Sequence, residues 1–287
     1  MPRLAGKATI VTGGAKGIGQ HYSQALAAEG ARVMIADIAD GSELAEEIAA
    51  RHGANSVASV KFDVSDERQV QRLVSQTIDR FGQIDILVNN AALYAKLKPR
   101  NFVEWDNETW DRVMAINVRG AFLMVKHVAP HMMERRTGKI INIASGSPYK
   151  GVPRMLPYVT SKGAILAFTR SLSRELGEYG IAVNSLSPGY TLSDTGLEMS
   201  PTSRKSVCAC AIAEPSSATH IPKISSAHFC SWPQAIAISS QANRSWWTAA
   251  RSITSWYAGP PAGRVSARRK TGYRSLKINI SFEGAHS

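Results

Sequence analysis

The chain has 287 residues, 44% of them hydrophobic, which suffices to bury a full core and favours one large domain or two small ones. No apolar stretch follows the first residues, and no run approaches the roughly 18 apolar residues of a membrane span, so we expect a soluble, cytoplasmic protein without a membrane partner. Of the 34 basic and 22 acidic residues, 11 and 2 follow Met199. The net charge of +12 therefore lies mainly in the tail, and we expect no nucleic-acid partner.

Up to about residue 190 the chain alternates apolar, strand-like runs with amphipathic, helix-like runs. The expected strands are Ala8–Thr12, Arg32–Asp37, Val57–Phe62, Ile84–Asn89, Lys139–Ile143 and Ile181–Ser187. The expected helices are Gly17–Glu29, Ser42–Arg51, Glu67–Phe81, Glu108–Glu134 and Tyr158–Tyr179. Several strands are continuous Val/Ile runs, as in strands that helices cover on both faces. This alternation predicts an α/β fold, a Rossmann-like, doubly wound parallel sheet in a single domain.

A glycine-rich segment, IVTGGAKGIG, follows the first expected strand and begins the first expected helix. In a nucleotide-binding turn, Gly13 permits the tight bend, Gly17 lets the backbone approach a pyrophosphate and Gly19 permits close packing of helix on strand. We therefore predict a dinucleotide site, to which Lys16 and Ile18 of the same loop also contribute. An ordinary strand–helix turn is the alternative.

Asp37 ends the second expected strand, 18 residues after Gly19. A carboxylate at this place accepts hydrogen bonds from ribose hydroxyls and repels a 2′-phosphate, which favours NAD over NADP. Lys16 favours NADP, because a cation in the glycine loop can meet that phosphate. Since Asp37 has the better geometry, we expect NAD as the cofactor. A solvated carboxylate at a strand end is the alternative for Asp37.

Tyr158 and Lys162 are four residues apart on an expected helix and so share one of its faces. A phenol has a pKa near 10, and a neighbouring ammonium stabilises the phenolate and lowers that pKa, which makes Tyr158 a usable acid/base group. Ser145 lies just beyond the strand Lys139–Ile143, at the end where such sheets bind ligands. Its hydroxyl can hold a substrate oxygen. Alone, the tyrosine–lysine spacing is more typical of a surface pair.

Together these motifs resemble the classical short-chain dehydrogenase/reductase family. The matching motifs, in order, are TGGAKGIG, NNA at Asn89–Ala91, Asn117 of MAINV, Ser145 at the end of INIAS, YVTSK, and SPG at Ser187–Gly189. The resemblance covers about residues 3–199. It implies an oxidoreductase that transfers hydride between NAD(H) and a small-molecule secondary alcohol or ketone.

The resemblance also implies a role for each matching residue. Tyr158 would be the general acid/base, Lys162 would bind the nicotinamide ribose and tune Tyr158, and Ser145 would orient the carbonyl or alcohol. Asn117 would hold a water that links Lys162 to solvent. Further cofactor contacts are implied for Asp63 and Val64 at the adenine, Asn90 and Ala91 beneath the cofactor, and Pro188 and Gly189 against the nicotinamide. The residues that would line the substrate pocket do not identify a substrate; they are Tyr94, Lys96, Lys98, Trp105, Pro148–Leu156 and the segment after Tyr190.

The chain departs from the family after about Met199, where serine becomes abundant and no periodicity persists. Members of the family end with P-E-D, a helix, T-G-Q, and a last strand before V-D-G-G, and none of these follows Gly189. The three cysteines, Cys208, Cys210 and Cys230, also lie in this tail and have no histidine at zinc-ligand spacing, so we expect no metal site.

The missing motifs appear when the codons are read one register over. Trp246–Thr248 must be encoded by TGG-TGG-ACN, and a frame that starts on the third base of each codon then gives Val-Asp, after which Ala249 and Ala250 allow Gly-Gly. We therefore predict a domain at residues 1–199 and a frameshifted, irregular tail at residues 200–287, with the shift between about Gly196 and His220. The last strand of the sheet would then be missing, and the homo-oligomer that the family implies would be disturbed. A divergent extension is the alternative.

Three other functions stay open at this point. The chain could bind the cofactor without catalysis, or it could be an NADP-dependent ketoreductase. A methyltransferase with a similar glycine loop is a third, but it leaves Ser145, Tyr158 and Lys162 unexplained.

Overall fold

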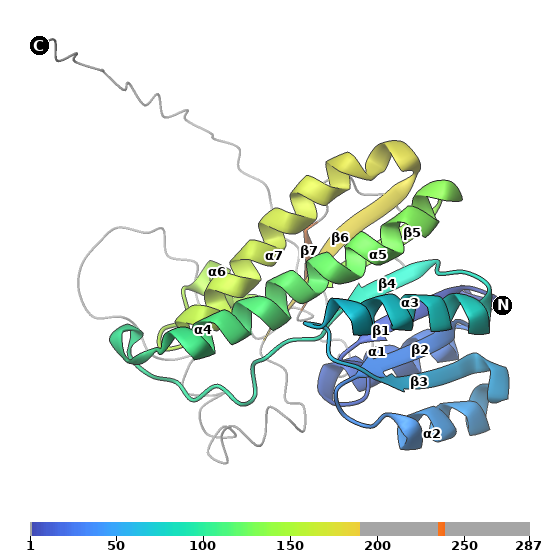
Figure 1. The fold of residues 1–287 in the computed structure, drawn as a ribbon, viewed down its shortest axis with the longest axis horizontal. Coiled ribbons are helices and arrows are strands. Elements are labelled where there is room, and N and C mark those ends of the chain that lie inside the picture. Colours follow the sequence, from blue (N-terminus) through green and yellow to red (C-terminus); the bar gives the residue numbers. More distant parts are fainter. Residues whose placement is uncertain (1, 190–234, 239–287) are drawn as a thin grey trace, which may run out of the picture. The chain divides into compact units, whose positions relative to one another are not determined.

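The computed structural model describes residues 2–189 and 235–238, all within one compact unit that extends from Met1 to Tyr257. A seven-stranded sheet lies at its centre, in the order β3-β2-β1-β4-β5-β6-β7 (Figure 1). The first six strands are parallel, and they are β1 (Ala8–Thr12), β2 (Arg32–Asp37), β3 (Val57–Lys61), β4 (Ile86–Asn89), β5 (Gly138–Ile143) and β6 (Ile181–Pro188). The strand order reverses between β1 and β4, where doubly wound sheets of the Rossmann type bind ligands.

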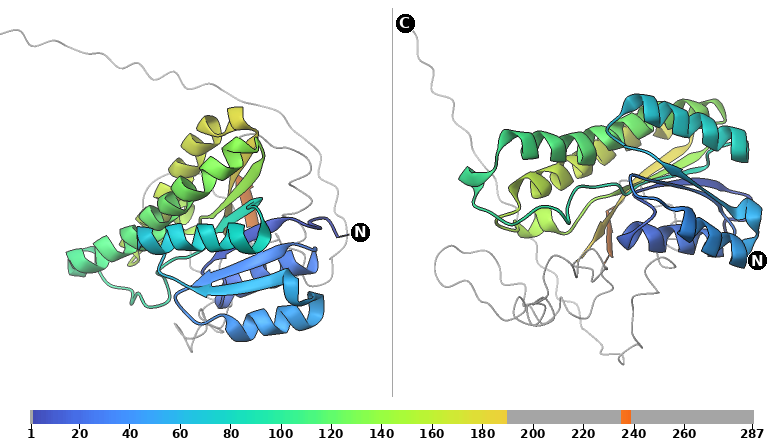
Figure 2. Two further views of the ribbon diagram at one scale, coloured as in Figure 1. Left: turned by 45° about the vertical axis from the view of Figure 1, so that its right-hand side comes forward. Right: turned by 60° about the horizontal axis from the view of Figure 1, so that its bottom comes forward.

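Helices cover both faces of the sheet, as the right-hand view of Figure 2 shows. They are α1 (Gly17–Ala28), α2 (Ser42–His52), α3 (Glu67–Phe81), α4 (Asn107–Met114), α5 (Gly120–Glu134), α6 (Ser147–Lys150) and α7 (Leu156–Glu175). Side chains alternate along each strand, so Ile10 and Met34 pack towards α3 and α5, while Val11 and Val33 pack towards α1 and α2. The predicted two-layer covering of the sheet is confirmed.

The predicted helix Glu108–Glu134 is interrupted. A π-helical turn at Ala115–Arg119 separates α4 from α5, and Gly120 directly follows this turn. Such wide turns inside helices are frequent at functional sites. None of the helices in the described part of the chain is long and apolar enough to cross a membrane.

The outer edge of β6 carries a further strand, β7 (Ala235–Ile238), which runs antiparallel, with Ser185 opposite Ile238 and Pro188 opposite Ala235. The prediction of a missing last strand is therefore wrong for these four residues. An open edge offers unpaired N–H and C=O groups, and an Ala-Ile-Ala-Ile segment has the β-branched residues that strands favour. Residues 190–234 and 239–287, with the three cysteines, lie outside the described residues, so the irregular, frameshifted tail stays a prediction.

Candidate active site

The glycine loop joins β1 to α1 at the carboxyl edge of the sheet. Gly13 and Gly17 have φ angles of +61° and +57°, in the left-handed region that favours glycine. A Cβ on Gly19 would lie 1.9 Å from the carbonyl oxygen of Gly13, so the loop is folded back on itself with no room for a side chain. Lys16, directly before α1, is exposed. The result is a bare backbone cradle at a helix N-terminus, which fits a pyrophosphate.

Asn90 and Ala91 support this loop from the neighbouring strand. The Nδ2 of Asn90 donates hydrogen bonds to the carbonyl oxygens of Thr12 and Gly13 at 3.0 and 2.9 Å. The backbone N–H groups of Asn90 and Ala91 both donate to Oγ1 of Thr12. These residues therefore fix the end of β1 against the end of β4, directly beneath the turn.

Asp37 lies at the end of β2 with its carboxylate against the glycine loop. Its Oδ2 accepts a hydrogen bond from the N–H of Ala15 at 3.0 Å, and its Oδ1 accepts one from Ala39 at 2.9 Å. Each carboxylate oxygen keeps a lone pair for a further donor. The adjacent Ile38 is 65% exposed, an apolar side chain in water beside the charged one. Ile38 is not among the predicted site residues, because nothing in a sequence marks which residue at a strand end stays uncovered.

Asp63 and Val64 form the turn between β3 and α3. Oδ1 of Asp63 accepts hydrogen bonds from the N–H and hydroxyl of Ser65. Val64 is buried against Gly120, the first residue of α5, where a Cβ would lie 2.8 Å from Cγ1 of Val64. This turn is therefore anchored, at the same carboxyl edge of the sheet as the glycine loop.

Ser145, Tyr158 and Lys162 come together between the end of β5 and α7. The hydroxyl of Ser145 hydrogen-bonds to that of Tyr158 and also accepts the N–H of Ser147 at 3.1 Å. The Nζ of Lys162 lies 5.8 Å from the ring centre of Tyr158. It donates a hydrogen bond to the carbonyl oxygen of Ile143, the last residue of β5, at 2.7 Å. The predicted convergence of the three side chains is present.

Burial sets the acid–base properties of this group. It raises the pKa of Tyr158 to about 12, although the hydrogen bond from Ser145 acts in the opposite direction. It also lowers the pKa of Lys162, which is 4% exposed, to about 8. For both groups burial disfavours the charged form and is the largest cause of the shift. That Lys162 tunes the pKa of Tyr158 stays a prediction.

Asn117 lies in the π-helical turn and is 2% exposed. Its Oδ1 accepts the backbone N–H of Leu93 at 2.7 Å, and its Nδ2 donates to Oγ of Ser161 at 3.0 Å. Both ends of the side chain thus have protein partners. Nδ2 also donates to the carbonyl oxygen of Leu93 at 3.4 Å, so a water on this side chain would be held by the second lone pair of Oδ1.

Pro188 is the last residue of β6 and Gly189 follows it, next to the connection that carries Ser145. The N–H of Gly146 donates to the carbonyl oxygen of Pro188 at 3.0 Å, and that of Ala144 donates to Leu186 at 2.8 Å. All of the predicted site residues therefore lie at the carboxyl edge of the sheet, although they come from eight separate segments.

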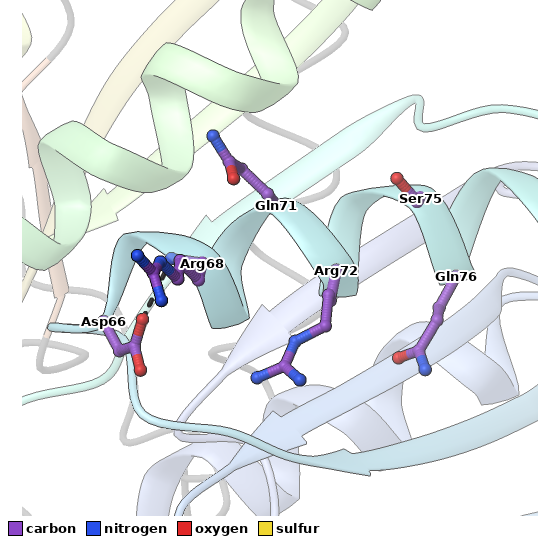
Figure 3. Close-up of a pocket in the computed structure, with 6 residues that line it drawn as sticks. All are labelled: Asp66, Arg68, Gln71, Arg72, Ser75 and Gln76. Atoms are coloured by element: carbon purple, nitrogen blue, oxygen red, sulfur yellow. Dashed lines mark hydrogen bonds between the residues drawn. The ribbon is translucent and has the colours of Figure 1, made fainter.

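A hollow elsewhere on the surface does not share these features. It runs along α3 and is lined by Asp66, Arg68, Gln71, Arg72, Ser75 and Gln76 (Figure 3). Asp66 is the N-cap of α3, and its carboxylate accepts the N–H groups of Arg68 and Gln69. Its role is to stabilise the helix, so the carboxyl edge of the sheet remains the candidate site.

Comparisons with known proteins agree with this geometry. Residues 7–204 match the family model of the short chain dehydrogenases. The sorbitol dehydrogenase of Cereibacter sphaeroides is 43% identical over 188 residues, which cover 65% of this chain and 71% of that protein. The galactitol 2-dehydrogenase of Agrobacterium fabrum (strain C58) is 41% identical over 189 residues, with 65% and 71% covered.

A solved structure gives the same result. The 3-ketoacyl-(acyl-carrier-protein) reductase of Brucella melitensis, complexed with NADH, superposes with a TM-score of 0.64 and 31% identity, covering 69% of this chain and 81% of that one. The protein therefore belongs to the short-chain dehydrogenase family, whose members are oxidoreductases that use a nicotinamide cofactor.

Proposed function

We propose that this protein is an NAD-dependent oxidoreductase that transfers hydride between NAD(H) and a secondary alcohol or ketone. The observation that carries the proposal is the convergence of Ser145, Tyr158 and Lys162 at the sheet edge that also bears the glycine loop. A tyrosine whose hydroxyl contacts a serine, with a lysine behind its ring, suits proton transfer to a carbonyl oxygen.

Tyr158 is the proposed acid/base. Because its pKa is raised, Tyr158 is a phenol at neutral pH and can donate its proton to a carbonyl oxygen during reduction. Ser145 donates a second hydrogen bond to the same oxygen, which fixes its position. Lys162 is held by Ile143 and is proposed to bind ribose hydroxyls and to stabilise the phenolate that remains. The cofactor, when bound, supplies or accepts the hydride.

The proposed cofactor is NAD. The bare loop at Gly13, Gly17 and Gly19 fits a pyrophosphate, and the carboxylate of Asp37 beside it suits free ribose hydroxyls and repels a 2′-phosphate. Lys16 is exposed, whereas the carboxylate of Asp37 is held against the glycine loop, so Asp37 is proposed to decide the preference. The further contacts proposed for the cofactor are Ile18, Asp63, Val64, Asn90, Ala91, Pro188 and Gly189.

The proposed substrate class is a polyol or its keto form. Relatives named for sorbitol and galactitol support this choice. The cytoplasmic location and a homo-oligomeric state also stay proposals.

The test uses purified protein with NAD or NADP and with sorbitol, galactitol or a simple secondary alcohol, followed by the absorbance of the reduced nicotinamide. NAD-linked turnover of at least one polyol is expected. Cofactor binding without turnover of any alcohol would favour the non-catalytic alternative. Faster turnover with NADP would favour the ketoreductase alternative.

A further inference from the structure

A closed series of contacts begins and ends on Tyr158. The hydroxyl of Ser161 donates to the backbone carbonyl of Tyr158 at 2.7 Å and accepts the Nδ2 of Asn117 at 3.0 Å. Asn117 in turn accepts the N–H of Leu93 at 2.7 Å. The next residue, Tyr94, contacts Tyr158 and so closes the series, because its ring centre lies 4.6 Å from that of Tyr158 with the planes tilted by 45°.

Tyr94 is held firmly in this arrangement. Its carbonyl oxygen accepts the N–H of Leu97 at 2.9 Å, which closes a turn just after Leu93. Its ring packs with that of Tyr158 on a cluster of buried residues that includes Leu97 and Met155. The separation of the two ring centres lies within the range of interacting aromatic pairs, and the tilt avoids a face-to-face sandwich. A series anchored at both ends restricts both the backbone and the ring of Tyr158.

We propose that Tyr94 is a positioning residue that acts through Tyr158, by fixing the orientation of its ring and by excluding water from it. This inference rests on the role of Tyr158 in the proposed function. Neither the family match nor the glycine loop requires an aromatic residue at this place. The alternative is that Tyr94 only fills space in the cluster.

The acid–base properties of Tyr158 agree with this role. Burial is the main reason that the pKa of Tyr158 is raised, and Tyr94 acts in the same direction through its own phenol. The other groups that face Tyr158 are Ser145, from the β5–α6 connection, and Lys162, on its own helix. Within the described part of the chain, Tyr94 is therefore the residue of the β4–α4 loop whose ring is paired with that of Tyr158.

The first test needs no substrate. Protein labelled with ¹³C at the tyrosine ζ carbons is titrated by NMR, and Tyr158→Phe identifies the signal of Tyr158. In Tyr94→Ala the pKa of Tyr158 is expected to fall from about 12 towards the ordinary value of 10.0, because water reaches the phenol. Tyr94→Phe keeps the ring and should retain most of the raised pKa. Circular dichroism at each pH monitors folding, and Tyr94→Leu replaces the alanine variant if that one does not fold.

The matched control is Tyr179→Ala, beyond the other end of α7, which should leave the signal of Tyr158 unchanged. An unaltered pKa of Tyr158 in both Tyr94→Ala and Tyr94→Leu overturns the inference.

The second test uses the alcohol turned over in the substrate panel. Tyr94→Ala is expected to lower kcat on the order of tenfold to a hundredfold, as misplaced catalytic groups do, and to shift the pH profile of kcat/KM to lower pH. Tyr94→Phe should restore both. Normal turnover in Tyr158→Phe would refute the proposed function instead, and the titration would still decide the role of Tyr94.

Discussion

The two halves of the candidate site differ in the groups that they present: the first presents backbone and the second presents side chains. From β1 to β4 the protein offers backbone, since the glycine loop is bare and Asn90 and Asp37 hold its amides and carbonyls in place. From β5 to β6 it offers side chains, and burial decides how Tyr158 and Lys162 ionise. The first half therefore depends on steric fit, while the second depends on solvation. A change of one methyl group should damage the first, and a change of one hydroxyl the second.

The largest expected effect is in the second half. Tyr158→Phe removes the proposed proton donor and should lower kcat by at least about 10²-fold, the scale of lost general acid/base catalysis. NADH binding should persist, because the glycine loop is untouched. Tyr179→Phe, which removes a phenol hydroxyl beyond the other end of α7, is the matched control and should keep normal turnover. Near-normal turnover in Tyr158→Phe would show that the catalytic assignment is wrong.

The next effect is in the first half. Gly19→Ala places a Cβ 1.9 Å from the carbonyl oxygen of Gly13, a backbone atom that cannot move without opening the turn. Overpacking of this kind typically costs about 1–3 kcal/mol, so NADH affinity, measured by fluorescence, should fall about tenfold or more. Gly163→Ala in α7 meets nothing within 4 Å and should leave affinity unchanged. Equal affinities in the two variants would refute the steric account of the loop.

A third effect concerns the amino ends of β1, β4 and β5, where the two halves meet at the edge of the sheet opposite to the site. Asp85 accepts the N–H of Ala8 at 2.9 Å and pairs with Arg135 at 3.3 Å and Lys7 at 3.6 Å. Burial acts against its charge, but these partners hold the pKa of Asp85 below its ordinary value of 3.8. Its charged form therefore stabilises the fold above that value, and the contribution is lost as pH falls through the lower, folded-state pKa.

Urea unfolding of Asp85→Asn measures this contribution. The free energy of unfolding at pH 7 should fall by about 1.5–3 kcal/mol, the scale of hydrogen bonds to charged groups. The difference in the free energy of unfolding between Asp85→Asn and the unmodified protein should become smaller in acid. Asp79→Asn, at an exposed position of α3, is the control and should change little. A difference that grows in acid would contradict the assignment.

Asp37→Ser should change cofactor preference without abolishing activity. The ratio of kcat/KM for NAD over that for NADP is expected to fall about tenfold, since a charged acceptor for the ribose is lost. Asp37 also holds Ala15 of the glycine loop, so both values of kcat/KM should decrease somewhat. Asp40→Ser, an exposed carboxylate three residues on, should leave the ratio unchanged. A ratio that favours NADP in the unmodified protein would refute the NAD assignment.

Changes in the tail, residues 200–287, are expected to affect the site least, because the tail lies after every proposed catalytic residue. The DNA of the source gene, read from the third base of each codon, should continue the family ending through Val-Asp-Gly-Gly at Trp246–Ala250. DNA without such an ending in any other frame would refute the frameshift.

Local patterns in the sequence predicted most of the fold. The bounds of β1, β2 and α3 agree with their predicted ranges, because continuous apolar runs, helical periodicity and a capping aspartate are properties of neighbouring residues. The glycine loop was predictable for the same reason. Glycine is required where a Cβ would meet the backbone of a residue only a few positions away, as at Gly19 and Gly13.

Tertiary structure decided the remaining properties. The pKa directions of Tyr158 and Lys162, the partners of Asn117 and the ring of Tyr94 depend on burial and on contacts between residues 13 to 64 positions apart in the chain. Solvation depends on everything that surrounds a group, so it cannot be inferred from spacing along one helix. The pairing of β7 with β6 also depends on tertiary structure, because an open strand edge pairs with a segment that the folded chain brings close to it. The sequence by itself determined which groups reach the edge of the sheet, and the packing around them determined their charge.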